Sequence, residues 1–410
     1  MAEPRCLASS GVGWTLAIVE VGEIVLVAWM ALSSIVVLAL GPLAVSVVRR
    51  IRLFERLDPP PLETWPMLSV IVPACNEEAT IGDALATLLA QDYPALEIIV
   101  VNDRSTDRTG EVVRRVASDD PRVLVIDVER LPEGWLGKVH ALKVGSDRAS
   151  GDFMLFTDAD IHFEDDALRR AVAFADQDEL DHLAILPKFI APSFWLRSLI
   201  VSFGAGFLMS MGAHRVGIPG TRFYVGVGAF NLVRRSALAR SEGLEWLRME
   251  VGDDVGLGLL LHRAGARAGF LVAGEMISVT WYPTVAAMIR GLEKNMYGIA
   301  CSYRLHRLFI AVPTSVAILL GPLVAITQLD RPWLMGMGIT AFLAAGAYHL
   351  TIGRMARLGV VESLVAPWGV FVLLYIVVRS AYYCIKNGGV HWRGTFYPLD
   401  ALRKGQRLGL

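Results

Sequence analysis

The sequence has few cysteines and few charged residues for its length. Its cysteines, Cys6, Cys75, Cys301 and Cys384, lie far apart in a chain of 410 residues. Their spacing predicts neither a disulfide framework nor a cysteine-ligated zinc site. Charged residues make up only 19% of the chain and the formal net charge is −1, so the broad positive field of a nucleic-acid-binding protein is missing. We therefore expect no nucleic acid among the partners.

Apolar residues are abundant instead, and they gather in long uncharged runs. They make up 54% of the chain, more than in an ordinary soluble domain. The first run predicts a transmembrane helix over residues 24–48, because about 20 apolar residues cross the hydrocarbon core of a bilayer. A cleaved signal peptide would be shorter and would end in small residues, whereas arginines follow this run from Arg49 to Arg56. Since Lys and Arg beside a span tend to stay cytoplasmic, we expect residues 1–23 outside and the chain after Arg49 inside.

Uncharged runs return near the C-terminus, where we expect a membrane region over residues 308–385. The runs 308–329 and 333–353 are separated by the sequence Asp-Arg-Pro. This arrangement is typical of a tight hairpin of two spanning helices.

A third apolar segment, 363–385, contains Arg379, which leaves a shorter uncharged stretch before it. If this segment crosses the membrane, the basic tail 386–410 lies outside, against the charge rule. The segment can span with a tilt, or it can lie partly re-entrant, in which case the tail stays inside. The sequence therefore predicts two or three C-terminal spans. In either case we expect a multi-pass protein of the cell (inner) membrane with residues 49–300 in the cytoplasm.

Residues 283–300 predict an amphipathic helix directly before the C-terminal spans. Its apolar residues recur at helical spacing, while Arg290, Glu293 and Lys294 occupy other faces. Its position favours a place on the membrane surface, and an ordinary helix packed on the domain is the alternative. A further apolar segment, 194–211, fits a buried core helix as well as a membrane-contacting one.

Between the membrane segments, residues 66–282 alternate short apolar runs with helical patterns, which predicts an α/β domain with a mainly parallel sheet. Strands are expected over residues 68–72, 96–101, 123–127 and 153–157. Polar residues follow these strands directly, and ligands of open α/β sheets bind just beyond the carboxyl ends of the strands.

The clearest of these polar groups is the pair Asp158 and Asp160, directly after the fourth apolar run. Carboxylate oxygens are the ligands that Mg²⁺ and Mn²⁺ prefer, and such ions keep other positions for water and phosphates. Acidic pairs also occur by chance on surface loops. The place of this pair at a strand end predicts that both residues bind a divalent cation, Mg²⁺ or Mn²⁺.

The order and spacing of the motifs resemble family 2 glycosyltransferases of the GT-A fold. The resemblance covers residues 68–269, and it is carried by five stretches of sequence: VIVPACNEE, IIVVNDRSTDRT, GWLGKVHALKVG, LFTDADI and GDDVGLGLLLHRAG. It implies a membrane-bound enzyme that takes a sugar from a nucleotide-diphosphate sugar.

The resemblance also implies the residues of the donor site. Asp103 would hydrogen-bond the nucleotide base, Lys138 would lie near the phosphates, and Asp158 would contact the ribose and the metal-bound diphosphate. Asn76 and Glu77 would line the same pocket.

An acidic pair, Asp253 and Asp254, stands where the family carries a pair whose second member is the general base. Transfer with inversion needs a base on the face opposite the leaving nucleotide, to take the proton of the acceptor hydroxyl. Asp254 is the expected base. The alternative is that these residues cap the following helix, since Asp is a favoured N-cap, and one can cap while the other catalyses.

The sequence departs from processive and sphingolipid-linked members in one place. Those members carry a Q/R-x-x-R-W motif after the base, whereas residues 290–297 read RGLEKNMY. Lys294 could pair with a diphosphate as a point charge, but the tryptophan has no evident replacement, so we do not expect processive synthesis. Residues 389–394, GVHWRG, resemble the ending of ceramide-glucosyltransferase-like and hopanoid-associated bacterial members. That likeness implies transfer of a single sugar to a lipid or lipid-linked acceptor.

Two other functions are weighed against this one. Nucleotidyltransferases that make nucleotide sugars share the sheet type and acidic metal sites, but no Gly-rich basic phosphate loop follows the first strand here. A non-catalytic protein that binds or transports nucleotide sugars is the other alternative. It would not need the donor-side and base-side carboxylates together.

Overall fold

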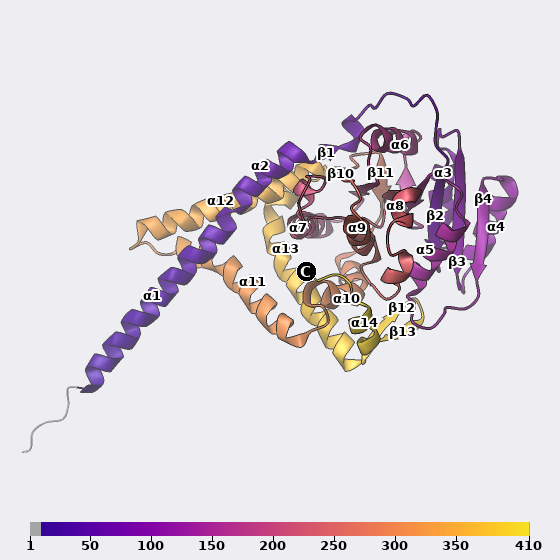
Figure 1. Cartoon of the computed structure of the whole chain (residues 1–410). Helices are drawn as coiled ribbons and strands as arrows, with labels where there is room; N and C mark the ends of the chain where they lie inside the picture. Colours follow the sequence, from indigo (N-terminus) through magenta and orange to yellow (C-terminus); the bar gives the residue numbers. More distant parts are fainter. Residues whose placement is uncertain (1–9, 410) are drawn as a thin grey trace, which may run out of the picture. The chain divides into compact units, whose positions relative to one another are not determined.

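The computed structural model describes residues 10–409 of the chain, and the side chains from Glu20 onward (Figure 1). The first nine residues of the expected N-terminal segment 1–23 lie outside this description. The chain divides into two compact units. The first contains the chain up to Val45 together with Ile310–Tyr348, and the second contains Ser46–Phe309 together with His349–Leu410.

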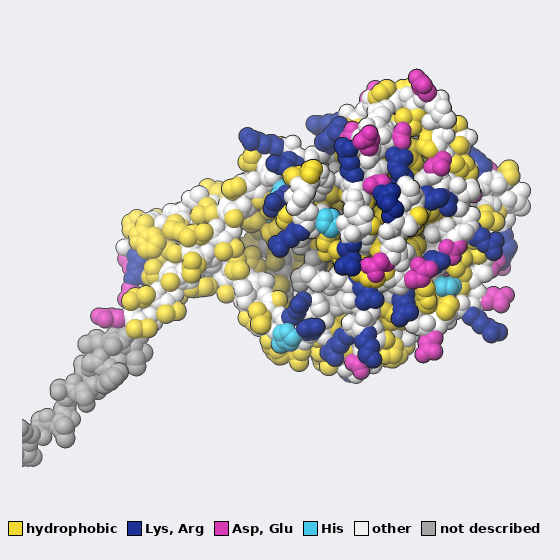
Figure 2. Space-filling model, viewed as in Figure 1, with side chains coloured by type: hydrophobic (Ala, Val, Ile, Leu, Met, Phe, Trp, Pro, Cys, Tyr) yellow, Lys and Arg dark blue, Asp and Glu magenta, His cyan; other side chains and the backbone are white. Residues whose placement is uncertain are grey.

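The first unit is helical. A small apolar core joins its helices, with Met30, Ala325 and Leu334 buried, and the Trp29 Nε1 donates to the carbonyl of Ala317 at 3.1 Å. Hydrophobic side chains cover most of the surface of these helices in Figure 2, whereas charged side chains are spread over the α/β unit. The helices of this unit, in whole or in part, are α1 (Ser10–Leu38), α2 (Leu40–Arg50), α11 (Leu305–Ile326) and α12 (Pro332–Met355).

Among the described residues, four helical stretches are long and apolar enough to cross a membrane. The first, Glu20–Arg50, contains the expected span 24–48, and α11 and α12 correspond to the expected hairpin. The fourth is α13 (Val360–Lys386), which at 27 residues is longer than the uncharged stretch that we recognised in the sequence. Its length permits a crossing. However, the tail after α13 contacts Glu77 and Gly137 of the α/β unit, so of the two or three C-terminal spans that the sequence predicts, two is the number that keeps the tail on the same side of the membrane as that unit.

The second unit is built on an eight-stranded sheet in the order β1-β10-β7-β9-β5-β2-β3-β4. All neighbouring strands are parallel except at β9, which is antiparallel to both β5 and β7. The predicted α/β fold with a mainly parallel sheet is therefore confirmed. The strands are β1 (Arg52–Leu53), β2 (Leu68–Ala74), β3 (Leu96–Asp103), β4 (Val123–Val128), β5 (Phe153–Phe156), β7 (His182–Leu186), β9 (Asn231–Arg234) and β10 (Ala268–Val272).

The central strands form because their apolar, β-branched runs are buried on both faces, as in parallel sheets generally. In β2, the five residues from Leu68 to Val72 are all buried. Helix α5 packs against β2 and β3, α4 packs against β4, and α6 packs against β7. The helices of this sandwich are α3 (Ile81–Leu89), α4 (Thr109–Asp119), α5 (Gly137–Arg148), α6 (Ala167–Gln177), α8 (Arg235–Ala239) and α9 (Asp253–Arg263).

Helices α7 (Phe194–Ser210) and α10 (Val285–Cys301) pack with α13 in the second unit. Met288 and Leu292 of α10 are buried in one cluster with residues of α7 and with Ile376 of α13. The face of α7 that packs on α10 and α13 is therefore buried in a core, in agreement with one of the two interpretations of the sequence. The apolar face of α10 is used in the same packing, and its place at a membrane surface stays a prediction.

The basic tail folds back onto the second unit. It forms a hairpin, β12 (Gly389–Trp392) paired antiparallel with β13 (Thr395–Pro398), followed by α14 (Leu399–Gly405). A third small sheet consists of β6 (His162–Phe163), β11 (Ile277–Val279) and β8 (Lys188–Phe189).

Candidate active site

The main pocket of the second unit has a volume of about 560 Å³ and opens at the carboxyl ends of the sheet strands. Its walls come from segments after β2, β5, β7 and β11, from the loop 226–229, and from α5, α7, α9 and α10. The tip of the β12–β13 hairpin completes it. This is the edge at which open α/β sheets bind ligands.

The pocket floor holds an ion-paired cluster built on Lys138, the second residue of α5. Its Nζ lies 2.8 Å from Asp158 Oδ1 and 3.2 Å from Asp253 Oδ2. Burial works against the charged lysine, but the two carboxylates outweigh it and raise the pKa of Lys138. Burial also works against the charge of Asp158, and Lys138 holds the pKa of that carboxyl below its usual value. Lys138 thus joins the donor-side motif to the acidic pair of α9.

Asp160 lies beside this cluster and lacks such a partner. Among the described residues, no other side chain forms an ion pair or hydrogen bond with its carboxylate. Burial, together with the negative charges of Asp158 and Glu77, raises its pKa to about 7. A divalent cation between Asp158 and Asp160 would relieve this repulsion, so the side chains fit the metal that the sequence predicted.

Within the described residues, no group of three His, Cys, Asp or Glu side chains converges to hold a metal by itself. A site of two carboxylates leaves most coordination positions open. Such openness is usual for Mg²⁺ sites that are completed by substrate phosphates and water.

Gly228 of the 226–229 loop lies between Asp254 and Asp158. Its Oδ2 accepts from the backbone N–H of Gly228 at 3.0 Å, and its Oδ1 accepts from Val255 N at 2.8 Å. A Cβ atom on Gly228 would stand 2.7 Å from Asp158 Oδ2 and 3.6 Å from Asp254 Oδ2. Only a glycine therefore lets the loop pass between the two carboxylates without displacing Asp158.

The two members of the acidic pair have different surroundings. Asp254 lines the main pocket, whereas Asp253 is buried and pairs with Lys138. The capping interpretation is wrong for Asp253, because Gly252 occupies the N-cap of α9 and Asp253 is the first helical residue. Burial raises the pKa of Asp253 to about 6, although Lys138 opposes the shift.

Glu77 lines the main pocket, whereas Asp103 and Asn76 are not among the residues that line it. Asp103 is 4% exposed, and both of its oxygens accept from the guanidinium of Arg104, at 2.7 and 2.9 Å. Asn76 is exposed and its Oδ1 accepts from Thr106 N at 2.8 Å, which ties the loop after β2 to the loop after β3. A contact of Asp103 or Asn76 with a donor stays a prediction.

Sequence reasoning missed the contribution of the C-terminal hairpin. His391, Trp392 and Arg393 line the pocket, and Arg393 forms an ion pair with Glu77, which is 316 residues away in the sequence. The sequence signal was the WRG motif, noted as a likeness to other enzymes but not placed in the site. Its place depends on the return of the chain after α13, which no local pattern shows.

One wall of the pocket is aromatic. Trp281 lies 5.0 Å from Phe189, 4.8 Å from Phe203 and 4.9 Å from Tyr282, measured between ring centroids. All four side chains line the main pocket. This wall offers an apolar surface next to the carboxylates.

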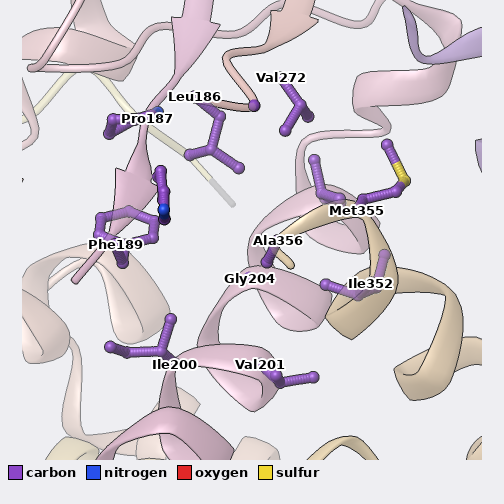
Figure 3. Close-up of a pocket in the computed structure, with 13 residues that line it drawn as sticks. Leu186, Pro187, Phe189, Ile200, Val201, Gly204, Val272, Ile352, Met355 and Ala356 are labelled. Atoms are coloured by element: carbon purple, nitrogen blue, oxygen red, sulfur yellow. The ribbon is translucent and has the colours of Figure 1, made fainter. Parts of the chain in front are cut away.

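A second, apolar pocket lies next to the main pocket (Figure 3). It is lined by residues of α7, by Ile352 and Met355 near the end of α12, and by Leu186 and Phe189, which it shares with the main pocket. Its volume of about 30 Å³ has room for about two water-sized groups. In this conformation it is too small for an acyl chain.

The sequence model described as "Glycosyl transferase family 2" matches residues 69–241. The chain is similar to this family over those residues, which are less than half of its length. The matched range begins in β2 and includes Asp158 and Asp160. It ends before the acidic pair of α9.

Curated relatives of the chain include two enzymes named for lipid-related acceptors. The beta-monoglucosyldiacylglycerol synthase of Synechocystis sp. is 30% identical over 230 residues, which are 52% of this chain and 46% of the relative. The 4,4'-diaponeurosporenoate glycosyltransferase of Staphylococcus aureus (strain USA300) is 35% identical over 131 residues, 31% of this chain and 33% of the relative. The matches therefore span less than half of each relative.

A solved structure shares the fold over most of the chain. It is a mannosyltransferase from Pyrobaculum calidifontis in complex with GDP-Man and Mn²⁺, with a TM-score of 0.52 and 20% sequence identity. The similarity covers 88% of this chain and 99% of that one. At this level of identity the likeness supports the GT-A type of fold.

Proposed function

We propose that the chain is an inverting, metal-dependent glycosyltransferase that moves a sugar from a nucleotide-diphosphate donor to a lipid or lipid-linked acceptor at the membrane. One observation carries this proposal. Asp158, Asp160 and Lys138 lie in the same pocket as Asp254, separated from it by Gly228. A donor site and a base on opposite sides of one space are what a direct displacement at the anomeric carbon requires.

On the donor side, Asp158 and Asp160 would hold Mg²⁺ or Mn²⁺. When bound there, the metal would neutralise the charge that develops on the departing nucleoside diphosphate. Glu77 and Lys138 line the same side of the pocket. The P. calidifontis enzyme has a similar fold and was solved in complex with GDP-Man and Mn²⁺, which supports the proposal of a nucleotide sugar and a divalent cation here.

On the opposite side, Asp254 acts as the general base. Its two backbone donors, Gly228 N and Val255 N, fix the orientation of the carboxylate. A carboxylate oxygen that accepts one hydrogen bond keeps a second lone pair for the proton of the acceptor hydroxyl. Attack from this side, opposite the leaving diphosphate, inverts the configuration of the sugar.

The acceptor is proposed to be a lipid because the pocket has an apolar wall and the chain has membrane-type helices. Phe189, Phe203 and Trp281 face the space beside the base. Four helical stretches of the described chain can cross a bilayer. The names of both curated relatives also point to lipid-related acceptors.

The catalytic unit is proposed to face the cytoplasm. Arg49 and Arg50 end the helix α2 that precedes it, and such basic residues tend to remain inside. Single cysteines introduced at exposed positions such as Arg130 or Lys404, in a background without native cysteines, should resist impermeant thiol reagents in intact cells and react after lysis. Labelling in intact cells would contradict this topology.

The transfer reaction is tested with the full-length protein in lipid nanodiscs. Sugar-labelled UDP-, GDP- and dTDP-sugars are supplied with a lipid extract and Mn²⁺, and the label that becomes lipid-soluble is measured. We expect transfer from one donor, loss of transfer with a chelator, and loss in Asp160→Asn. The matched control is Asp165→Asn, an exposed acid five residues further on that lies outside the pocket.

Full transfer in the presence of chelator, or in Asp160→Asn, would refute the metal-dependent mechanism. Binding of a labelled donor without transfer to any lipid fraction would favour the binding-only alternative. Formation of a nucleotide sugar from a nucleoside triphosphate and a sugar 1-phosphate would favour a nucleotidyltransferase.

A further inference from the structure

The C-terminal hairpin is fixed along the donor side of the active site. Tyr397 of β13 accepts a hydrogen bond from the backbone N–H of Gly137, at the start of α5, at 3.1 Å. Thr395 accepts from Arg104 at 3.1 Å, and the same guanidinium holds Asp103. The hairpin is therefore attached beside Asp103, the residue that is expected to bind the nucleotide base.

The segment after the hairpin is anchored as well. The carboxylate of Glu250 is buried and accepts from the backbone N–H groups of Arg407, Leu408 and Gly252 at 2.6, 3.0 and 3.1 Å. Glu250 lies just before the acidic pair of α9, so the tail and the base are held by one segment. The hairpin is a fixed part of the site.

The hairpin tip projects a cation into the pocket. Arg393 and Gly394 form the turn, with φ angles of 47° and 77°, as a two-residue hairpin turn of this handedness requires. The Nη2 of Arg393 donates to Glu77 at 2.5 Å, and the side chain is 43% exposed. Among the described residues, no other group accepts from Arg393. A guanidinium has five N–H donors, so most of those on Arg393 are available to a ligand.

A second cation stands beside the tip. The Nζ of Lys294 lies 3.9 Å from the centroid of the Trp392 ring, within cation–π range. Burial first, and then the like charges of Lys138 and Arg393, lower the pKa of Lys294 to about 8, while Asp253 and Asp158 act in the opposite direction. Among the described residues, Lys294 forms no ion pair, so Lys294 and the remaining N–H donors of Arg393 are both available to an anion in the pocket.

We propose that Arg393, together with Lys294 held on the Trp392 ring, binds the diphosphate of the donor and replaces the Q/R-x-x-R-W motif that residues 290–297 lack. This inference rests on the proposed function. A planar guanidinium binds phosphate oxygens in pairs, and Lys294 adds a point charge. Arg393 and Lys294 are binding residues, and Trp392 is a positioning residue that acts through Lys294.

A purely structural role for Arg393 is the alternative, in which its ion pair with Glu77 only attaches the hairpin to the domain. The two roles predict different effects of an Arg393 substitution on nucleotide affinity. A structural attachment would affect nucleoside mono- and diphosphates alike, whereas a diphosphate-binding residue would reduce the preference for the diphosphate.

The test measures the affinities of UDP, UMP, GDP and GMP for the full-length protein in Mn²⁺, by titration calorimetry. In the wild type, one base should show a clear preference for the diphosphate. In Arg393→Ala, diphosphate affinity should fall roughly 10- to 100-fold, the usual effect of losing hydrogen bonds to a charged group, with little change for the monophosphate. Arg393→Lys should be intermediate because it keeps the charge and loses the fork.

Lys404→Ala is the matched control, since it removes an exposed cation of the same tail outside the pocket. Lys294→Met should also reduce the diphosphate preference. Combining Trp392→Leu with Lys294→Met should reduce this preference little further, because Trp392 acts through Lys294. A wild-type protein that binds none of these nucleotides would overturn the proposed function together with this inference. A wild type that prefers the diphosphate, with the same preference in Arg393→Ala, would overturn only the inference. Equal weakening of mono- and diphosphate, with a lower Tm, would assign Arg393 the structural role.

Discussion

The ion pairs of Lys138 make a strong prediction about stability. Lys138→Met keeps the length of the side chain and removes its charge. The closer partner, Asp158, has a side chain that is 38% exposed, whereas Asp253 is only 8% exposed. Exposed pairs contribute about 0–1 kcal/mol, but breaking a buried pair costs about 3–5 kcal/mol because one charge is left unpaired. Most of the loss therefore comes from Asp253.

We expect Lys138→Met to lower the free energy of unfolding by about 3–5 kcal/mol at neutral pH. For a unit of this size that corresponds to a decrease in Tm of roughly 6–10 °C. The assay is thermal unfolding in detergent with a chelator present, so that metal binding does not contribute. Lys143→Met is the matched control on the same helix, because its partners Asp147 and Glu245 are more than half exposed and their loss should cost less than about 1 kcal/mol.

The difference in Tm should depend on pH. The raised pKa of Lys138 keeps the lysine charged through the acid range, so the change comes from its partners. Asp253, with a pKa near 6, loses its charge below that pH and then needs no counter-ion. Asp158, with a lowered pKa, keeps its charge to below its usual range. The difference in Tm between Lys138→Met and wild type should become smaller from about pH 7.5 to about pH 5, but it should not reach zero. An equal gap at both pH values, or a decrease in Tm no larger than that of Lys143→Met, would refute this reasoning.

Three further predictions follow from the site. Asp254→Asn should keep donor affinity but lose transfer by about 10²- to 10⁴-fold. Asp253→Asn should instead lower the Tm, because Lys138 loses its buried partner. If Asp253→Asn lost more transfer activity than Asp254→Asn, the base would be Asp253. Gly228→Ala should weaken Mn²⁺-dependent nucleotide binding about tenfold or more. The new Cβ would lie 2.7 Å from Asp158 Oδ2, while the ion pair with Lys138 holds Asp158 and the hydrogen bond to Asp254 holds the Gly228 backbone. Unchanged affinity in calorimetry would show that the Asp158 carboxylate can shift at no cost. Burial and like charges lower the pKa of Lys294 to about 8. Diphosphate affinity should therefore fall as the pH rises from about 7 to about 9, because Lys294 loses its charge. Lys294→Arg should remove this pH dependence, and a wild-type affinity that does not change with pH would exclude Lys294 from the binding site.

The sequence by itself determined the type of fold and the order of its motifs. Strands such as β2 and β3 were predictable because a continuous β-branched run between turn residues is typical of a strand that is buried on both faces. The apolar helices were predictable because crossing a bilayer sets a minimum length. The pair Asp158 and Asp160 could be placed at a strand end for the same local reason, and parallel strands present their carboxyl ends at one edge.

Only the tertiary structure decided which distant groups meet. Lys138 contacts both Asp158 and Asp253, and Arg393 reaches Glu77 from the far end of the chain. The separation of Asp253 from Asp254, one buried on a lysine and one facing the pocket, depends on where α9 begins and on the close passage of Gly228. Local periodicity fixes helices and strands because it depends on neighbours within a few residues. The contacts of a site depend on how those elements pack, and the return of the C-terminal hairpin to the donor pocket is set by that packing alone.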